Sequence, residues 1–132
     1  MGCVLDACAL IAFLRDEPGA EVVEQRLLDG NCFAHAVNLC EVYYDCIRVD
    51  GEQRAGALIS DLLEIGLIYR ADMDEAYWKD VGGLKAHIAR ISLADCFAIS
   101  LARRLGLPVL TSDHHEFDNI LAQGVCAVAF IR

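Results

Sequence analysis

Short apolar segments alternate with longer helix-like segments along the chain, and this alternation constrains the fold more than any other feature. The short segments are apolar without interruption, which is typical of strands buried on both faces of a parallel sheet. We expect strands at residues 3–5, 31–36, 67–69, 109–111 and 125–131. Strands that alternate with helices predict an α/β fold in which a central, mostly parallel five-stranded sheet is flanked by helices.

The segments between these strands carry the start and stop signals of helices. Asn38 is expected to cap the third helix, and Gly106 followed by Pro108 closes the sixth. We expect helices at residues 7–14, 18–28, 38–49, 52–65, 74–89, 92–105 and 114–122. The chain contains no repeat, low-complexity segment or linker, so residues 1–132 are expected to form one domain.

The balance of charged residues limits how this protein can bind nucleic acid. Acidic residues number 20 and basic residues 11, which gives a formal net charge of −9. This charge excludes a general basic nucleic-acid-binding protein, because such binding depends on cationic side chains that neutralise phosphates. An enzyme that reaches phosphate through bound metal ions is not excluded.

The apolar content is high for a soluble protein. Counted with glycine and without tyrosine, apolar residues make up about 61% of the chain, against about 45–50% in ordinary domains. The longest apolar run, Ala7 to Leu14, is eight residues long, whereas a membrane span needs about 20. We therefore expect no membrane association. We expect Tyr43, Tyr44 and Trp78 to pack in the core. We also expect an apolar surface that is covered by a second copy or another protein.

The amino-terminal segment and the cysteines indicate the compartment. No basic segment precedes the first apolar run, and Asp6 interrupts it, so we expect no secretory signal and a cytoplasmic location. The chain has seven cysteines, an odd number, and no C-x-x-C pair. We expect these cysteines to be reduced, buried thiols.

Two of the expected strands are followed by an aspartate. Asp6 follows the first strand, and Asp113 comes two residues after the fourth. Ligands bind at the carboxyl ends of the strands in an open parallel sheet, so both carboxylates are candidate ligand-binding groups. Both also precede an expected helix, where Asp is a favoured cap, and Asp113 with Glu116 fits a capping box. The local pattern leaves both interpretations open.

Two further acidic residues lie in unusually apolar helices. Asp95 has apolar neighbours one helical turn away on either side, where an ionised group is costly unless it is paired or bound to a metal. It also fits a capping box that begins at Ser92. Glu41 lies near the start of its helix, and it shares a face with Asp45 and Arg48, so a solvated polar stripe is the alternative.

These four carboxylates converge at one end of the sheet if the first and fourth strands are neighbours. Like charges in one place repel one another unless cations hold them, and carboxylate oxygens are suitable ligands for Mg²⁺ or Mn²⁺. Such ions activate water for the hydrolysis of phosphodiester bonds. The acidic residues therefore predict a metal site that acts on phosphodiesters.

Four segments carry a resemblance to a known family: Val4–Ala7, Asn38–Val42, Leu93–Ala98 and Leu107–Phe117. Through them the chain resembles the PIN-domain ribonucleases, specifically the VapC-type toxins of bacterial toxin–antitoxin modules. The resemblance implies a catalytic, metal-binding quartet: Asp6, Glu41, Asp95 and Asp113. Asp118 resembles an accessory acidic position. Thr111 either holds Asp113 in place or is an ordinary strand residue.

The resemblance also implies a function. A protein of this kind is an endoribonuclease that uses Mg²⁺ or Mn²⁺ to hydrolyse RNA, with tRNA among the expected substrates. It pairs with a cognate antitoxin that blocks the site. The apolar surplus favours a homodimer. The first alternative is a catalytically inactive PIN-fold binding module, which the complete quartet disfavours.

Two other classes of small α/β domain fit the sequence less well. A phospho-signalling receiver domain needs adjacent acids after the first strand and a lysine after the last, but the only lysines are Lys79 and Lys85, both elsewhere. A Mg²⁺-dependent haloacid-type phosphatase needs a D-x-D motif at the first strand, but Asp6 is followed by Ala7 and Cys8.

Overall fold

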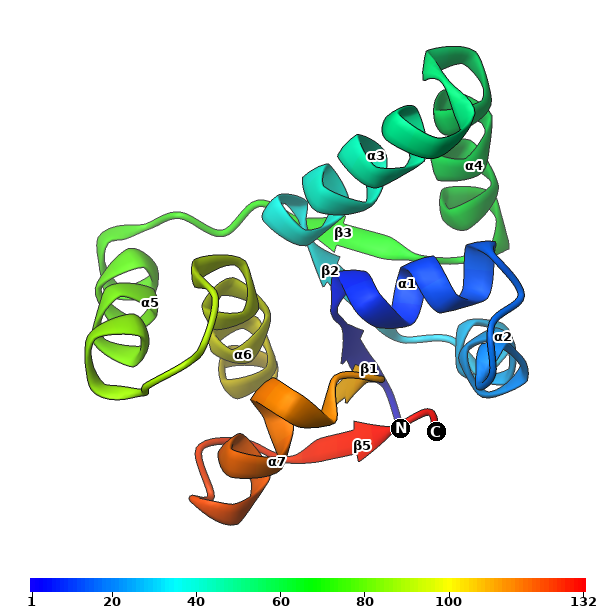
Figure 1. Ribbon diagram of the computed structural model, residues 1–132. Helices are drawn as coiled ribbons and strands as arrows, with labels where there is room; N and C mark the ends of the chain where they lie inside the picture. The colour runs from blue at the N-terminus through cyan, green and yellow to red at the C-terminus, as the bar shows by residue number, and fades with distance from the viewer.

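The computed structural model describes residues 1–132 and contains one five-stranded sheet with helices on both faces (Figure 1). The strands are β1 (Cys3–Leu5), β2 (Cys32–His35), β3 (Ile68–Arg70), β4 (Val109–Thr111) and β5 (Val128–Phe130). Their order in the sheet is β3-β2-β1-β4-β5, and every neighbouring pair is parallel. The expected α/β class is confirmed, and the sheet is parallel throughout.

Seven helices connect the strands in the expected order. They are α1 (Ala7–Leu14), α2 (Ala20–Asp29), α3 (Ala36–Asp50), α4 (Glu52–Ile65), α5 (Glu75–His87), α6 (Leu93–Leu105) and α7 (His114–Ala122). Helix α2 begins two residues later than predicted from Pro18, because Gly19 at its N-cap takes a left-handed conformation, with φ of 98°.

The start of α3 contradicts the prediction that Asn38 caps this helix. The N-cap is His35, whose ring Nδ1 accepts a hydrogen bond from the Val37 backbone N–H at 3.0 Å. Because His35 is also the last residue of β2, the strand passes directly into the helix. Asn38 therefore lies inside the first turn of α3, where it is fully buried.

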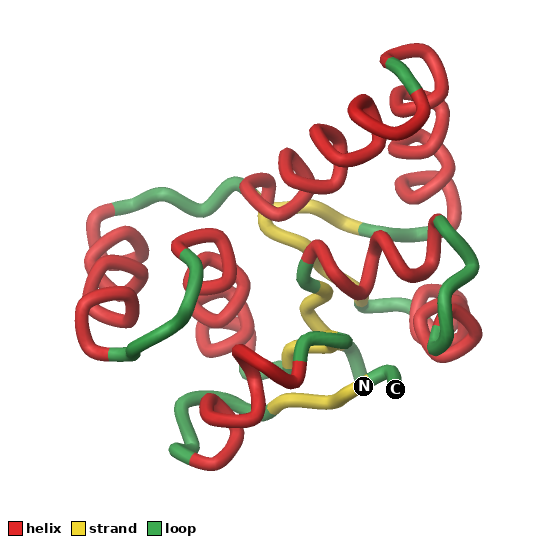
Figure 2. Tube along the Cα trace, viewed as in Figure 1, coloured by secondary structure: helices red, strands yellow, loops and turns green.

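The side chains of the sheet belong to two separate cores. In β1, Cys3 and Leu5 belong to one core and Val4 to the other, because side chains alternate between the faces of a strand. Helices α1 to α4 pack on the first face and α5 to α7 on the second (Figure 2). The central strands β1 and β4 are buried on both faces, as expected for apolar strands of a parallel sheet, whereas the edge strand β3 is partly exposed.

Several residues that were expected in the core lie at the surface. Tyr43, Tyr44 and Trp78 are 40%, 65% and 48% exposed, so the prediction that they pack in the core is wrong. All seven cysteines are free thiols, but Cys8 and Cys40 are exposed. No helix combines the length and the apolar character needed to cross a membrane.

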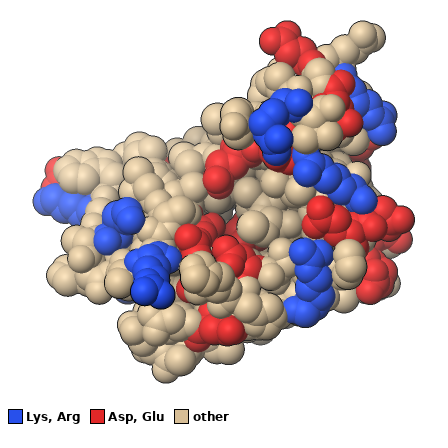
Figure 3. All heavy atoms as spheres, in the orientation of Figure 1, with Lys and Arg blue, Asp and Glu red and all other residues tan.

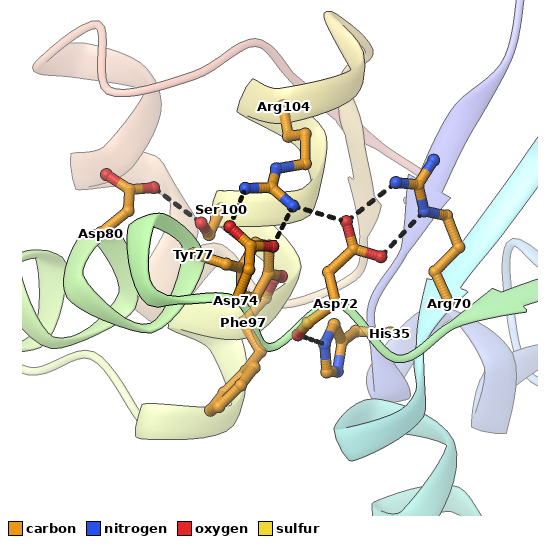
Figure 4. A network of polar contacts seen from close by, with 9 residues as sticks. All are labelled: His35, Arg70, Asp72, Asp74, Tyr77, Asp80, Phe97, Ser100 and Arg104. Carbon is orange, nitrogen blue, oxygen red and sulfur yellow. Dashed lines mark hydrogen bonds and ion pairs between the residues drawn. The ribbon is translucent and has the colours of Figure 1, made fainter.

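A cluster of ion pairs lies at the carboxyl end of α6 (Figure 4). Arg104, in the last turn of α6, donates hydrogen bonds to Asp72 at 3.0 Å and to Asp74 at 2.6 Å. Arg70, at the end of β3, donates two hydrogen bonds to Asp72, at 2.8 and 3.0 Å. We call these four residues the paired cluster. Their ion pairs hold the segment between β3 and α5 against α6.

Candidate metal centre

Asp6, directly after β1, is fully buried at the carboxyl edge of the sheet. Its Oδ1 accepts a hydrogen bond from the Ala9 backbone N–H at 2.9 Å, so the carboxylate caps α1. Its Oδ2 accepts a hydrogen bond from the Thr111 hydroxyl at 2.5 Å. The predicted cap is real, and the same carboxylate is also held in one orientation by a neighbouring strand.

Thr111, the last residue of β4, connects the two strand-end aspartates. Its buried hydroxyl donates to Asp6 and accepts a hydrogen bond from the Asp113 backbone N–H at 3.0 Å. The Asp113 carboxylate in turn accepts from the Glu116 backbone N–H at 3.1 Å and caps α7. Since β1 and β4 are adjacent, Thr111 fixes Asp6 and Asp113 at the same edge.

Asp95, in the first turn of α6, joins Asp113 and Glu116. One carboxylate oxygen from each of the three lies within 4.8 Å of the others. Helix α6 is capped by Ser92, whose hydroxyl accepts a hydrogen bond from the Asp95 backbone N–H at 3.1 Å. The Asp95 carboxylate is 9% exposed and forms no ion pair, so it is free to bind a ligand.

Glu116 was not predicted as a ligand. The capping-box interpretation assigns its carboxylate to the Asp113 backbone N–H, but Thr111 already accepts that hydrogen bond. The signal available in the sequence was its spacing, because residues three positions apart lie on the same side of a helical turn.

Glu41 approaches the other carboxylates from α3. Glu41 is exposed as a residue, and partial desolvation of its carboxylate still raises its pKa, whereas the nearby Asn38 amide lowers it. The charge of Glu41 also raises the pKa of Asp6 and of Glu116. We call the set of five carboxylates the acidic rim: Asp6, Glu41, Asp95, Asp113 and Glu116.

The electrostatic field of the acidic rim is strongly negative. Burial, helped by the charges of Asp113 and Glu41, raises the pKa of Asp6 from 3.8 to about 7, although the hydrogen bond from Thr111 opposes the shift. Although Cys8 is exposed as a residue, partial desolvation of its thiol and then the charges of four rim carboxylates raise the pKa of this thiol to about 12. An opposite charge bound here would relieve both effects.

No cation of the protein pairs directly with the acidic rim, although the charge of Lys85 lowers the pKa of Glu116. None of its five carboxylates forms a salt bridge. In Figure 3, acidic atoms gather at the middle of the molecule, with basic atoms on either side of them. A set of unpaired carboxylate oxygens fits a hard divalent cation such as Mg²⁺ or Mn²⁺, which prefers oxygen ligands.

The predicted accessory residue Asp118 lies apart from this group. Its exposed carboxylate pairs with the His114 ring at 2.9 Å and is not among the closely spaced oxygens. The structure thus brings the four residues of the predicted quartet to one edge, adds Glu116, and places Asp118 elsewhere.

The fold and the acidic rim together define an α/β domain with a candidate divalent-metal centre at the carboxyl edge of its sheet. A family model described as the PIN domain matches residues 3–121, and the chain belongs to the PIN domain family. No curated protein sequence matches the chain.

Solved structures with the same fold cover nearly the whole chain. VapC20 of Mycobacterium tuberculosis, described as a Sarcin-Ricin loop cleaving toxin, is 13% identical with a TM-score of 0.71, over 89% of this chain and 95% of that one. A toxin–antitoxin complex from Klebsiella pneumoniae is 15% identical with a TM-score of 0.73, over 99% and 98%. A DNA-bound VapBC from Salmonella typhimurium is 16% identical with a TM-score of 0.75, over 100% and 99%.

Proposed function

We propose that this protein is a metal-dependent endoribonuclease and the toxin of a toxin–antitoxin pair. The observation that carries the proposal is the acidic rim, in which five carboxylates gather without a cation of the protein. Their mutual repulsion is relieved when Mg²⁺ or Mn²⁺ binds. Membership of the PIN domain family and the structural likeness to VapC20 support RNA as the substrate.

The residues of the acidic rim have different roles in the proposed reaction. Asp95, Asp113 and Glu116 offer the most closely spaced oxygens and would hold the cation. Asp6, fixed by Thr111, and Glu41 complete the negative field that retains it. A divalent cation in this place supplies positive charge that offsets the charge developing on a phosphodiester and makes water a stronger nucleophile.

Two arginines that pair with Asp45, one helical turn beyond Glu41, support the binding of a polyanion. Asp45, four residues after Glu41 on α3, accepts hydrogen bonds from Arg48 at 2.7 Å and from Arg15. Two guanidinium groups share one carboxylate, so the group keeps one positive charge. We propose that this charge contacts a phosphate adjacent to the one bound at the acidic rim.

An apolar groove beside Glu41 supports the proposal of an antitoxin partner. Residues of α3, α4 and β3 line it: Ala36, Leu39, Cys40, Tyr43, Gly56, Ile59 and Tyr69. The Klebsiella relative was solved as a toxin–antitoxin complex. A segment bound along this groove would reach the acidic rim, because Cys40 and Glu41 are consecutive residues. A homodimer would cover part of the remaining apolar surface.

The proposed activity is tested with purified protein and single-stranded RNA. We expect cleavage with Mg²⁺ or Mn²⁺ and none with EDTA. Full cleavage in EDTA would exclude the metal mechanism, and binding of Mn²⁺ without cleavage of any RNA tested would favour an inactive binding module.

The proposed homodimer is tested by light scattering of the isolated chain. The measured mass should be at least twice 14.5 kDa, whereas a monomer would contradict the homodimer.

A further inference from the structure

Asn38 is a buried polar residue that the start of α3 does not require. His35 is the N-cap and accepts the Val37 backbone N–H, so the Asn38 side chain is not needed as the cap. Asn38 is fully buried, and its Nδ2 donates a hydrogen bond to the Ala94 carbonyl of α6 at 3.1 Å. Its function must therefore be sought in the contact between α3 and α6.

Asn38 connects two helices that carry acidic rim residues. Glu41 lies three positions further along α3, on the same side of the helix, and the nearby Asn38 amide lowers the pKa of its carboxylate. Ala94 directly precedes Asp95 in the first turn of α6. The Asn38 amide thus lies next to Glu41 and to the helical turn that carries Asp95.

The Asn38 side chain also keeps an unpaired oxygen. Its Oδ1 is the only buried side-chain polar atom in the protein without a hydrogen-bond partner. An unsatisfied buried acceptor costs about 1–3 kcal/mol, and an apolar residue of similar shape would avoid that cost. Stability alone does not explain an asparagine here.

We propose that Asn38 is a positioning residue of the metal centre, which sets Glu41 of α3 against the Asp95 turn of α6 through its Nδ2 and leaves Oδ1 as a neutral acceptor. This inference rests on the metal centre of the proposed function. A neutral amide suits the task, because a carboxylate at this position would add another negative charge to the acidic rim. Groups that orient metal ligands change metal affinity without touching the ion.

The substitution Asn38→Leu separates positioning from a merely structural role. It keeps the number and branching of the side-chain heavy atoms, removes the unpaired Oδ1 and removes the contact with Ala94. We expect the melting temperature in EDTA to be unchanged or higher. Mn²⁺ affinity, measured by calorimetry on the metal-free protein below its unfolding transition, should fall about tenfold to a hundredfold. In RNA cleavage, kcat should fall while KM stays near the wild-type value.

Two further variants make the result decisive. Asn38→Ala removes the same amide and replaces Asn38→Leu in these measurements if the leucine variant does not fold. Asn119→Leu makes the same exchange on the exposed face of α7 and should leave Mn²⁺ affinity unchanged. Mn²⁺ affinity within twofold of wild type in a folded Asn38 variant would overturn the proposal. Because Mn²⁺ binding is measured without RNA, failure to cleave RNA would refute the nuclease function but not this inference.

Discussion

Two acidic regions lie at opposite ends of α6 and differ in how their charge is balanced. At the carboxyl end, hydrogen bonds from Arg104 lower the pKa of Asp74 to about 2. Hydrogen bonds from Arg70 and then Arg104 lower the pKa of Asp72. At the amino end, the acidic rim has no arginine or lysine partner, and burial raises the pKa of Asp6 to about 7.

The difference distinguishes carboxylates that hold the fold together from those that are kept for a ligand. The paired cluster gains stability from its own cations, whereas the acidic rim has no such partner and would gain stability from the external cation that we propose. The two regions should therefore respond in opposite ways to mutation, metal and pH.

The largest expected effect is the loss of activity on removing a rim charge. Asn caps a helix about as well as Asp, so Asp6→Asn and Asp113→Asn should fold normally. If these groups hold a cation, RNA cleavage in Mg²⁺ should fall by at least about a hundredfold. Thermal unfolding in EDTA should be unchanged or shifted upward, because a like charge has been removed.

The control for these variants is Asp61→Asn, an exposed aspartate of α4. It should keep wild-type cleavage. If Asp6→Asn and Asp113→Asn also cleave RNA normally, these two aspartates are helix caps only, and the catalytic assignment is wrong.

The next effect is a stability that falls as pH rises in the metal-free protein. Asp6 ionises near pH 3.8 when unfolded and near 7 when folded. Between these values the folded state holds the extra proton, so the free energy of unfolding decreases with rising pH, by an amount of the order of a few kcal/mol. Melting in EDTA should thus be lower at pH 7.5 than at pH 5.

Two comparisons sharpen this pH prediction. Asp6→Asn should lose most of the decline in stability, and Mn²⁺ at pH 7.5 should restore wild-type melting. The lowered pKa values of Asp72 and Asp74 act in the opposite direction, because their contribution is lost only on acidification below about pH 4. A metal-free wild type that grows steadily more stable from pH 5 to pH 7.5 would contradict the assigned burial of a rim charge.

A smaller effect is expected in the paired cluster. Asp72→Asn weakens hydrogen bonds from two guanidinium groups that are each about one third exposed, so water screens part of the loss. The free energy of unfolding should fall by about 1–2 kcal/mol in urea titrations. Cleavage per folded molecule and Mn²⁺ affinity should not change. A selective loss of cleavage in this variant would remove the distinction between the two regions.

The smallest expected effect concerns the arginines beside the acidic rim. Arg48→Gln should raise KM for RNA severalfold, leave kcat unchanged and reduce the salt dependence of binding by about one phosphate contact. Lys79→Gln is the matched control, because Lys79 pairs with Glu75 on the exposed face of α5. Equal effects of the two substitutions would show that Arg48 contributes only general charge.

Much of the fold and the position of the quartet could be predicted from the sequence. The ends of the strands can be predicted from local apolar runs. Because the carboxyl ends of parallel strands lie at the same edge of a sheet, Asp6 and Asp113 must lie at one edge. The function of Asn38 could not be predicted, because an N-cap and a buried amide one turn later have the same local pattern. Glu116 was missed for a similar reason, since its spacing from Asp113 also fits a capping box.

The exposure of the aromatic residues could not be predicted from the sequence either. The hydrophobicity of Tyr43 and Tyr44 is the same in a core and on a surface that binds another protein. Only the position of α4 against α3 decides which side of each ring is covered, and that position depends on long-range packing. The excess of apolar residues indicated such a surface without locating it.

The strand order has a consequence for the synthesis of the protein. β1 is the middle strand, yet the hydrogen bond that fixes Asp6 comes from a residue 105 positions later. At about 5–20 residues per second, translation needs roughly 5–20 s to cover that distance. Until β4 docks, β1 presents an unpaired edge and no metal centre exists. If the acidic rim is the active site, a nascent or truncated chain that ends before Asp113 would not cleave the RNA around it, and the proposed nuclease would become active only when its synthesis is nearly finished.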